Sequence, residues 1–480
     1  MRAVSIVWFR NDLRIEDNAA LTAAVDRGGS IVPIFIWAPE EEGDWPPGSA
    51  SRWWLHQSLK AMQKKLKSLG SRLILRKGPS EKTLSSLAKE TNASAIYWNR
   101  QYEPALRKRD QQVEKHLSEL LEIVATFNGN LMFEPDEIRT KQGDPYRVFT
   151  PFWKRCQDRD EPREPLPAPE KLASPKSWPN SEELDTFELE PKIDWAGGMQ
   201  ETWTPGEDGA DERLTRFLQQ SAKNYKTQRD YPGERGTSEL SPHLHFGEIS
   251  PYQIWHAVRH VTGDDLRTTA GKSGQTYLSE LGWREFAHHV LFHYPHTTDQ
   301  PLNEKFQKFP WKSNKSASKA WQRGQTGIPI VDAGMRQLWE TGWMHNRVRM
   351  VVASFLTKDL QITWLEGAKW FWDTLVDADL ANNTLGWQWA GGCGADAAPY
   401  FRIFNPMTQG KKFDKEGHYV HHYVPELEGL PAACLHEPWE AKTSVLSQAN
   451  VELGEDYPEP IVDHSNARKE ALEAFEKVKG

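Results

Sequence analysis

The stretch from Asp377 to Phe413 gathers residue types that suit a large aromatic ligand. Asp377 and Asp379 are followed by side-chain amides and by two tryptophans, Trp387 and Trp389. Carboxylates accept hydrogen bonds from ribose hydroxyls and ring N–H groups, amides bond the edge of a heteroaromatic ring, and tryptophans offer flat faces for stacking and a path for electrons. This combination predicts a large aromatic cofactor beside an aromatic substrate. Composition alone leaves a polar loop over a tryptophan-rich core as the alternative.

The composition is typical of a soluble globular protein with two domains. Of the 480 residues, 38% are hydrophobic and 26% are charged, and the chain is too long for one ordinary domain. The sequence contains no run that could span a membrane, and its N-terminus lacks a signal-peptide pattern. Its three cysteines are widely separated and show no metal-ligand spacing, so we expect no metal site and a reducing, cytoplasmic location.

The charge and the aromatic content narrow the possible partners. The formal net charge of −8 argues against a nucleic-acid partner, because phosphate contacts need Lys and Arg. A DNA-binding function therefore requires a local basic surface on an acidic body. The 22 tryptophans exceed what a core of this size needs, which makes stacking and electron transfer worth considering.

Residues 1–130 alternate strand-like and helix-like runs. This order predicts an α/β domain with a doubly wound parallel sheet. No Gly-x-Gly-x-x-Gly follows the first strand, so we expect no ordinary dinucleotide site there, although a ligand could lie at the carboxyl ends of the strands, beside the loop Arg10–Arg14. The strand-like runs are Val4–Trp8, Ile31–Trp37, Leu73–Leu75, Ala95–Trp98 and Ile123–Phe127, and the clearest amphipathic run is Ser51–Leu69.

The remaining sequence predicts a linker and an all-helical domain. Residues 131–205 contain the Pro-rich, charged segment Glu161–Pro169 and suit a linker that crosses a surface. Residues 206–480 show helical periodicity and predict an all-α domain. The clearest helical runs in it are Asp211–Tyr225, Thr276–Phe292, Ile330–Thr341 and Asn346–Asp359.

Several motifs resemble the photolyase/cryptochrome family. Trp387-Gln-Trp389, followed by Asp396-Ala-Ala-Pro-Tyr-Phe-Arg-Ile-Phe-Asn-Pro, is similar to the signature of that family. The separate motifs occur in the family's order, so chance is a poor explanation. The resemblance extends over nearly the whole chain, from Trp8-Phe-Arg-Asn-Asp-Leu-Arg14 to His436-Glu-Pro-Trp439.

The resemblance is greatest to photolyases that repair cyclobutane pyrimidine dimers in DNA. Ser51–His56 and Gly282-Trp283 resemble their class III branch, which lies near the plant cryptochromes. The resemblance implies a monomeric, light-driven lyase that acts on UV-damaged DNA through an electron from reduced FAD. It also implies that the α/β domain is an antenna domain and that the helical domain binds FAD.

A segment rich in hydroxyl groups leads to a helix start at Ser241-Pro242. Helix N-termini and turns rich in N–H groups bind phosphates without a Lys, although most such segments are only helix caps. The resemblance implies that this segment binds the FAD pyrophosphate. The FAD-binding residues that it implies are Tyr225, Thr237, Ser238, Glu239, Leu240, Ser241, Tyr277, Arg284, Asn346, Arg349, Asp377, Asp379 and Asn383.

Two of these residues bear on the chemistry of the flavin. A buried Arg349 needs a carboxylate partner, and the resemblance implies an ion pair with Asp377; the alternative is an exposed Arg on a charged face. The resemblance places Asn383 at flavin N5, where plant-type cryptochromes carry an Asp. An amide cannot supply a proton, but it can hydrogen-bond a reduced, anionic flavin. Asn383 therefore favours repair over signalling.

Glu280 and Trp283 lie three residues apart in a helical run and face the same way. Taken alone, Glu280 reads as a salt-bridged surface residue. The resemblance implies that it hydrogen-bonds the dimer bases and stabilises their radical anion, and that Trp283 and Trp389 pack against the lesion. Asn346 and Met350 also contact the lesion in this interpretation. Photolyases for (6-4) photoproducts carry histidines at these two positions, so the sequence predicts a cyclobutane-dimer substrate.

Four basic residues are candidates for the DNA backbone. The resemblance implies that Arg229, Arg402, Lys411 and Lys412 form the basic surface that an acidic DNA-binding protein requires. The alternative is a solvated charged face, and this applies most strongly to the two lysines.

Three tryptophans match the electron-transfer chain of the family. The resemblance implies that Trp387, Trp364 and Trp311 photoreduce oxidised flavin by stepwise hopping. Single tryptophans at such spacings are usually core residues, so this assignment depends on the match.

A second chromophore is expected in the N-terminal half. Asn99-Arg-Gln-Tyr-Glu103 resembles the segment that carries the folate-binding Glu of folate-type photolyases, which predicts an antenna of 5,10-methenyltetrahydrofolate. Thr298 and Asp299 depart from the pattern of one branch, so a deazaflavin or an empty site remains open. The rival function is a cryptochrome-like photoreceptor that signals through partner proteins.

Overall fold

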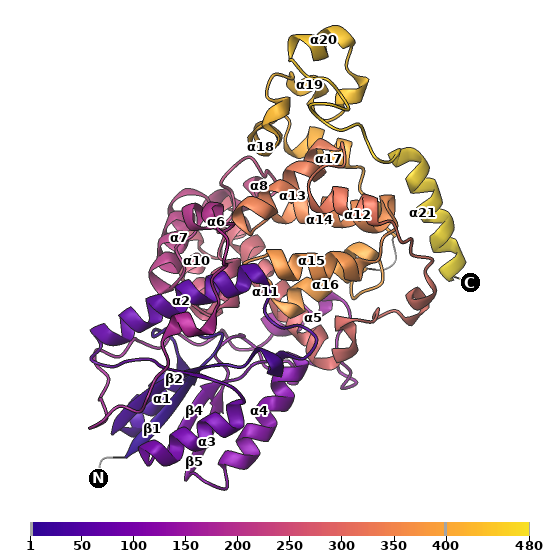
Figure 1. The fold of residues 1–480 in the computed structure, drawn as a ribbon. Coiled ribbons are helices and arrows are strands. Elements are labelled where there is room, and N and C mark those ends of the chain that lie inside the picture. The colour runs from indigo at the N-terminus through magenta and orange to yellow at the C-terminus, as the bar shows by residue number, and fades with distance from the viewer. Residues whose placement is uncertain (1–2, 398–400, 480) are drawn as a thin grey trace. The chain divides into compact units, whose positions relative to one another are not determined.

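A five-stranded parallel sheet begins the structure, which is a computed structural model that describes residues 3–397 and 401–479. The strand order is β3-β2-β1-β4-β5, with every neighbouring pair parallel (Figure 1). Because the chain winds outwards from β1 in both directions, the sheet is doubly wound, as predicted. The strands are β1 (Val4–Phe9), β2 (Ser30–Trp37), β3 (Ile74–Lys77), β4 (Ala95–Asn99) and β5 (Ile123–Phe127).

The chain forms two compact units. The first unit comprises Met1–Lys223, Ser238–Pro295 and Val376–Leu380, and the second comprises Asn224–Thr237, His296–Leu375 and Ala381–Gly480. The helices that begin in the first unit before Pro295 are α1 (Ala19–Arg27), η1 (Pro39–Glu42), α2 (Ser49–Ser68), α3 (Ser80–Thr91), α4 (Pro104–Leu117), α5 (Phe149–Gln157), η2 (Leu184–Phe187), α6 (Gly197–Thr202), α7 (Glu207–Gln220), η3 (Ala222–Asn224), α9 (Ser241–His245), α10 (Pro251–Thr262) and α11 (Thr269–His293).

The later part of the chain is helical, which confirms the second expected fold class. None of the helices that the structure describes combines the length and the apolar character that a membrane crossing needs. The remaining helices are α8 (Tyr225–Gln228), η4 (Pro295–Thr298), η5 (Glu304–Lys308), α12 (Lys315–Gln322), α13 (Pro329–Thr341), α14 (Asn346–Ser354), η6 (Phe355–Asp359), α15 (Trp364–Thr374), α16 (Leu380–Gly391), α17 (Pro406–Phe413), α18 (His418–Tyr423), η7 (Pro425–Leu427), α19 (Ala432–Leu435), η8 (Pro438–Glu440), α20 (Thr443–Gln448) and α21 (His464–Lys479).

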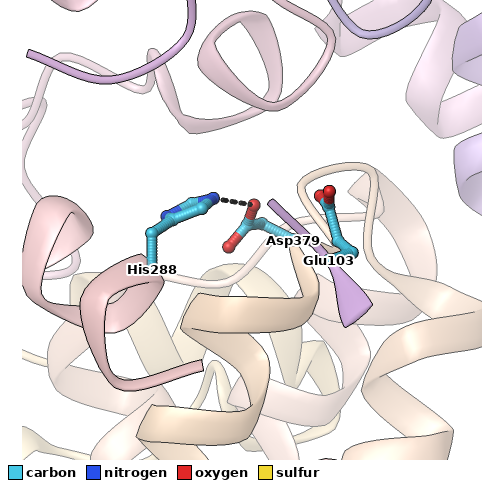
Figure 2. A group of neighbouring side chains, drawn as sticks. All are labelled: Glu103, His288 and Asp379. Carbon is cyan, nitrogen blue, oxygen red and sulfur yellow. Dashed lines mark ion pairs between the residues drawn. The ribbon is translucent and has the colours of Figure 1, made fainter. Parts of the chain in front are cut away.

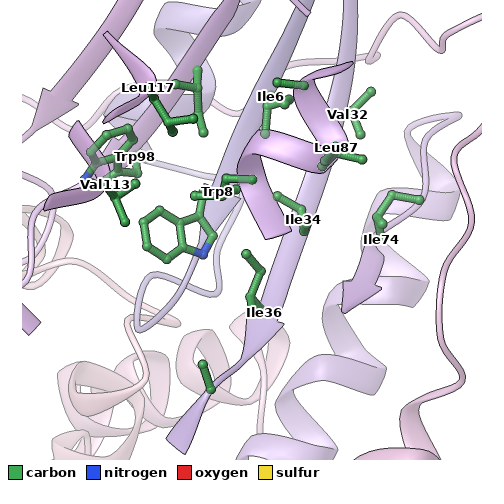
Figure 3. Packing of buried hydrophobic residues seen from close by; sticks show 14 residues of the cluster. Ile6, Trp8, Val32, Ile34, Ile36, Ile74, Leu87, Trp98, Val113 and Leu117 are labelled. Atoms are coloured by element: carbon green, nitrogen blue, oxygen red, sulfur yellow. The ribbon is translucent and has the colours of Figure 1, made fainter. Parts of the chain in front are cut away.

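The core of the sheet explains why its strands are continuous apolar runs. Trp8 of β1 and Trp98 of β4 meet edge to face, with ring centroids 5.7 Å apart. Leu87 of α3 and Val113 and Leu117 of α4 complete the same cluster (Figure 3). Strands of a parallel sheet are covered on both faces, so their side chains need apolar partners on each side.

The carboxyl end of β1 is occupied by a side chain of the chain itself. Arg10 is buried, and its guanidinium lies 4.2 Å from the Trp8 ring centre. It pairs with Asp110 at 3.2 Å and donates to the carbonyl oxygen of Asn99. Arg10, in the loop after β1, is therefore held by contacts within the protein.

One expected helix changes its type part-way along. The run predicted over Asn346–Asp359 is α-helical only to Ser354 and continues as the π-helix η6. The wider turn accommodates Lys358, which is fully buried and donates from Nζ to the Gly391 carbonyl oxygen at 2.6 Å. Single π-turns inside α-helices are frequent at functional sites.

Candidate functional site

The predicted site residues divide between the two units. The set in the first unit is Glu103, Ser238, Glu239, Leu240, Ser241, Tyr277, Glu280, Trp283, Arg284, Asp377 and Asp379. The set in the second unit is Tyr225, Arg229, Thr237, Trp311, Asn346, Arg349, Met350, Trp364, Asn383, Trp387, Trp389, Arg402, Lys411 and Lys412. Because Arg349 and Asp377 lie in different units, their ion pair stays a prediction.

The segment before α9 has a shape that its side chains fix. The Tyr277 hydroxyl donates to Ser238 Oγ at 2.9 Å, and burial raises the pKa of Tyr277. Glu239 adopts a left-handed backbone with φ of 54°, and its carboxylate pairs with Arg213 and, at 2.6 Å, with Arg216. These contacts hold the turn that leads into the α9 N-terminus, where the sequence predicted a phosphate site.

Asp379 lies beside a histidine that the sequence analysis missed. His288 Nε2 lies 3.3 Å from Asp379 Oδ2, and a Glu103 oxygen lies within 4.8 Å of the facing atoms of both (Figure 2). Burial alone would raise the pKa of Asp379, but His288 and then Arg284 outweigh it and hold this pKa well below its ordinary value. A signal was present in the sequence, because His288 follows Arg284 by four residues and so shares its face of α11.

These three side chains are also the only group in the described part of the chain with the spacing of metal ligands. His288 argues against such a use. Its Nδ1 faces the Arg284 carbonyl oxygen at 3.1 Å while its Nε2 faces the Asp379 carboxylate. With Asp379 ionised, Nε2 donates to its carboxylate and Nδ1 to the carbonyl oxygen, so His288 and Asp379 are satisfied as an ion pair.

Glu280 and Trp283 lie on α11, and both are half-buried. The Trp283 ring stacks on Phe149 of α5, with centroids 3.9 Å apart and planes 10° from parallel. Gly282 lies against the Trp153 ring of α5, which a Cβ at position 282 would approach to 2.6 Å. Close packing of α5 on α11 therefore fixes the orientation of Trp283.

In the second unit, Asn383 has a defined orientation. Its side-chain nitrogen donates to the Ala368 carbonyl oxygen of α15 at 3.0 Å. The amide oxygen of the half-buried side chain is therefore the acceptor that remains for a ligand. This matches the chemistry expected of a group that faces an N–H of a reduced flavin.

Helix α14 carries Asn346 at its first residue, where it is exposed, and Met350 one turn later, where it is half-buried. Arg349 donates from Nε to the Met344 carbonyl oxygen at 2.7 Å. His345 turns away from both, because its Nδ1 accepts from the Arg347 N–H at 3.1 Å and caps the helix. Burial lowers the pKa of His345 to about 4, so the side chain is neutral near pH 7.

Trp389 and Arg402 are brought together at a small hollow. The Arg402 guanidinium lies 5.9 Å from the Trp389 ring centre, and the centroids of the Phe404 and Trp389 rings lie 6.3 Å apart. The hollow is lined by Ser354, Trp389, Ala390, Asp396, Ala397, Arg402 and Phe404. Residues 398–400 of the family signature lie outside the described residues.

A larger concave surface, which encloses a volume of about 380 Å³, is lined in part by Lys412. Arg347, which the sequence analysis did not single out, lies 2.7 Å from Asp230 and 4.4 Å from the Phe413 ring centre there. Lys411 is already paired with Glu437. The surface is lined by Thr227, Asp230, Tyr231, Arg347, Phe404, Gln409, Lys412 and Phe413. Arg229 lies beside Tyr225, with its guanidinium 5.4 Å from that ring centre.

The expected electron-transfer tryptophans occupy different environments. Trp387 and Trp364 are buried, whereas Trp311 is half-buried and lies 4.3 Å from the Phe309 ring. Trp387 packs so closely on α15 that a Cβ at Gly367 would lie 2.1 Å from its ring. The missing side chain of Gly367 therefore makes room for Trp387.

The fold is that of a protein in which an α/β domain precedes a helical part, and comparisons with known proteins identify the class of each. The family model described as DNA photolyase matches residues 5–170, and the model described as FAD binding domain of DNA photolyase matches residues 277–477. The chain belongs to the photolyase/cryptochrome family.

Full-length relatives define the branch. The chain is 48% identical to the deoxyribodipyrimidine photo-lyase of Agrobacterium fabrum, over 99% of this chain and 98% of the relative. It is 41% identical to cryptochrome-1 of Arabidopsis thaliana, over 99% of this chain and 70% of the relative. The crystal structure of a bacterial class III photolyase from Agrobacterium tumefaciens superimposes with a TM-score of 0.95 at 48% identity, covering 100% of this chain and 98% of that one.

Proposed function

We propose that this protein is a deoxyribodipyrimidine photo-lyase, an enzyme that repairs cyclobutane pyrimidine dimers in DNA with light. The observation that carries this function is the 48% identity to a protein of that name over nearly the whole of both chains. The 41% identity to a cryptochrome is lower, and the class III photolyase structure matches the complete chain.

Bound FAD supplies the electron that light excites, and the residues of this chain bind and tune it. Ser238, fixed by Tyr277, and the turn before Ser241 suit the pyrophosphate, because they offer hydroxyl and N–H groups at a helix start. Asp377 and Asp379 suit ribose hydroxyls or ring N–H groups. The other residues that we assign to FAD are Tyr225, Thr237, Glu239, Leu240, Arg284, Asn346, Arg349 and Asn383.

Asn383 is the residue that we expect to stabilise the reduced form of the flavin. Its amide nitrogen is held by Ala368, so the amide oxygen accepts a hydrogen bond from the flavin ring. An amide adds no negative charge and no acidic proton, and a reduced anionic flavin is therefore tolerated beside it.

The lesion is extruded from the duplex, as in other enzymes that act on a base. A fused dimer stacks and pairs poorly, which makes its extrusion easier than that of intact bases. Glu280 hydrogen-bonds the dimer and stabilises the charge that develops on it, and Trp283 and Trp389 pack against it. Asn346 and Met350 contact it in place of the histidines of (6-4) photolyases.

Backbone phosphates are bound by Arg229, Arg402, Lys411 and Lys412. Lys412 lines the 380 Å³ concave surface, and Arg347 adds a cation there. The pairing of Lys411 with Glu437 makes it the weakest of the four candidates, because binding DNA would first break an ion pair.

Trp387, Trp364 and Trp311 are assigned to photoreduction of the flavin. We expect Trp387→Phe to abolish photoreduction, because phenylalanine is far harder to oxidise than tryptophan. Chemical reduction of the flavin then restores repair. The measurement is flavin absorbance under blue light, with Trp339→Phe, an exposed tryptophan, as the control. Normal photoreduction of the Trp387 variant would remove this residue from the chain.

The antenna, the oligomeric state and the cellular location are also part of the proposal. We assign 5,10-methenyltetrahydrofolate as the antenna, with Glu103 as its candidate ligand, and we expect a cytoplasmic monomer. The domain boundaries that we expect, 1–130, 131–205 and 206–480, also stay a prediction.

The test of the function is repair of a thymine-dimer oligonucleotide by the purified protein under blue light, with the flavin verified as reduced. We expect intact thymines to return in the light and not in the dark. Absence of repair, together with binding of a signalling partner, would instead support the photoreceptor function.

A further inference from the structure

Three titratable side chains meet in the first unit, and the repair chemistry uses them only in part. Glu103 comes from the residue before α4, His288 from α11 and Asp379 from the segment Val376–Leu380 (Figure 2). One polar atom of each lies within 4.8 Å of the others. We assigned Asp379 to FAD and Glu103 to an antenna, whereas His288 has no assigned role.

The geometry of His288 defines its charge. Nδ1 faces the Arg284 carbonyl oxygen at 3.1 Å, and Nε2 faces the Asp379 carboxylate at 3.3 Å. An uncharged imidazole can donate from only one nitrogen, so both contacts are satisfied only by an imidazolium. Burial opposes this charge, but Asp379 and then Glu103 outweigh burial, and the pKa of His288 is raised.

Glu103 is the member of the cluster whose charge can change. Its Oε2 accepts from the Tyr102 N–H at 3.0 Å. Burial raises the pKa of Glu103, with His288 opposing and Asp379 adding to the shift. From η1, Glu42 adds a second carboxyl whose pKa burial and Glu103 raise to about 8.

Other charged groups face the cluster from neighbouring elements of the same unit. Arg284 lies one turn before His288 on α11, and it adds a fixed positive charge near Asp379. Burial lowers the pKa of His245 at the end of α9, and the negative charge of Asp379 opposes this shift. The Tyr102 ring lies edge-on to His288 with centroids 6.4 Å apart. The positive charge of Arg109 opposes the rise in the pKa of Glu42. On α11, burial raises the pKa of Glu285 to about 7, and the charge of His288 acts on this carboxyl too. Glu103 is the carboxyl of raised pKa that has an oxygen within 4.8 Å of His288.

We propose that Glu103 and His288 form a titrating pair that positions Asp379 and sets how the reduction potential of the bound flavin depends on pH. The proposal rests on the proposed function, because it takes Asp379 to be a FAD-binding residue. With Glu103 protonated, the charges of His288 and Asp379 cancel, and ionisation of Glu103 leaves the three side chains with a net negative charge. Reduction of FAD to its anionic form takes up two electrons and one proton, and added negative charge opposes it.

The first test uses the protein without flavin. The ring nitrogens of the histidines are labelled with ¹⁵N, and His288 is titrated by NMR in the wild type and in Glu103→Gln. We expect His288 to be doubly protonated at pH 7 and its pKa to be lower in the variant than in the wild type, because an opposite charge is lost. The control is Glu190→Gln, which removes the carboxylate 3.4 Å from His56 and leaves the His288 curve unchanged. A neutral His288 at pH 7, or identical curves for wild type and Glu103→Gln, would overturn the proposal.

The second test uses the holoprotein without added folate. The midpoint potential of the bound flavin is measured from pH 6 to 9, with dithionite as the electron source. We expect the potential of the wild type to fall more steeply with pH where Glu103 ionises, and we expect this break to be lost in Glu103→Gln. The same break in the pH dependence of both proteins would refute the proposed role of Glu103 and His288, even if the wild type repairs dimers. A wild type that fails to repair dimers but shows the break only with Glu103 intact would refute the function and leave the pair standing.

Discussion

The side chain of Asn383 shows how one hydrogen bond can define the chemistry of a position. Because Ala368 takes the amide nitrogen, the amide oxygen is left as the acceptor. An Asp at the same place would present an oxygen too, but it would carry either a negative charge or a transferable proton. The difference between the two side chains therefore concerns charge and not shape.

We expect Asn383→Asp to weaken binding of reduced FAD relative to oxidised FAD by about tenfold, or about 1.4 kcal/mol, because a carboxylate repels the anionic flavin. The measurement is the midpoint potential of the bound flavin at pH 8. Asn382→Asp is the matched control, since Asn382 is exposed and points from another side of α16. Equal shifts in both variants would show that Asn383 does not face the flavin.

At the scale of single residues, the sequence predicted residue types better than partners. Asp379 and Asn383 stand out because carboxylates and amides are unusual in a tryptophan-rich stretch. His288 and Arg347 look ordinary, since each sits on a helix among other polar residues. Their importance arises from Asp379 and Asp230, which are distant in the chain, and no local pattern reports such a contact.

At the scale of elements, helix α14 begins with an unusual cap. His345 accepts the Arg347 N–H through Nδ1, a role that requires a neutral ring. Its pKa lies at about 4 in the folded protein against about 6.5 when unfolded, so the unfolded chain binds a proton first as pH falls. The stabilising contribution is complete above about pH 6.5 and is lost between about pH 6.5 and 4.

We expect His345→Asn to reduce the loss of stability on acidification by roughly 3 kcal/mol between pH 7 and pH 4, because Asn caps a helix without titrating. Urea unfolding at several pH values measures this change. A matched comparison is His260→Asn on the surface of α10, for which we expect no such change. An unaltered acid sensitivity of the His345 variant would contradict a neutral, buried cap.

Gly367 of α15 has no side chain, and this leaves room for the Trp387 ring. A Cβ there would lie 2.1 Å from the Trp387 ring, so we expect Gly367→Ala to displace that ring and to lower the free energy of unfolding by about 1–3 kcal/mol. Photoreduction of the flavin should slow in the same variant. Gly386→Ala on α16 is the control: no atom lies within 4 Å of its Cβ, and we expect a gain of about 0.5–1 kcal/mol. Thermal unfolding and flavin absorbance distinguish the two outcomes.

Element boundaries could be predicted where local chemistry sets them and not elsewhere. The strands and the helix over Ile330–Thr341 follow from apolar periodicity, and α13 ends at Gly342 in a left-handed conformation that glycine favours. The π-turn of η6 could not be predicted, because it depends on the contact of Lys358 with a carbonyl 33 residues away. The expected helix over Asp211–Tyr225 was also placed wrongly, since α7 spans Glu207–Gln220.

At the scale of the whole molecule, an acidic chain of net charge −8 has to bind a polyanion. In the proposed DNA-binding surface, Lys412 lies on a concave surface with Arg347 and Asp230, which pair with each other, while Lys411 is paired with Glu437. Local charge and not net charge then determines DNA affinity.

We expect Lys412→Gln to weaken binding of dimer-containing DNA and to reduce the slope of log K against log salt by about 0.9, the value for one lost phosphate contact. Fluorescence anisotropy over a range of salt concentrations gives this slope. Lys415→Gln removes an exposed charge three residues along the chain and should leave the slope unchanged. If both variants behave alike, the 380 Å³ surface does not bind phosphate.

The division of the chain into units also restricts how this protein can be taken apart. The backbone passes from one unit to the other after Lys223, Thr237, Pro295, Leu375 and Leu380. No single proteolytic cut releases either unit complete, and a gene split anywhere between Asn224 and Leu380 would leave both halves with pieces of both. Attempts to express the sheet-containing unit or the helical unit alone, or to exchange one of them between relatives, must therefore transplant several separate segments together.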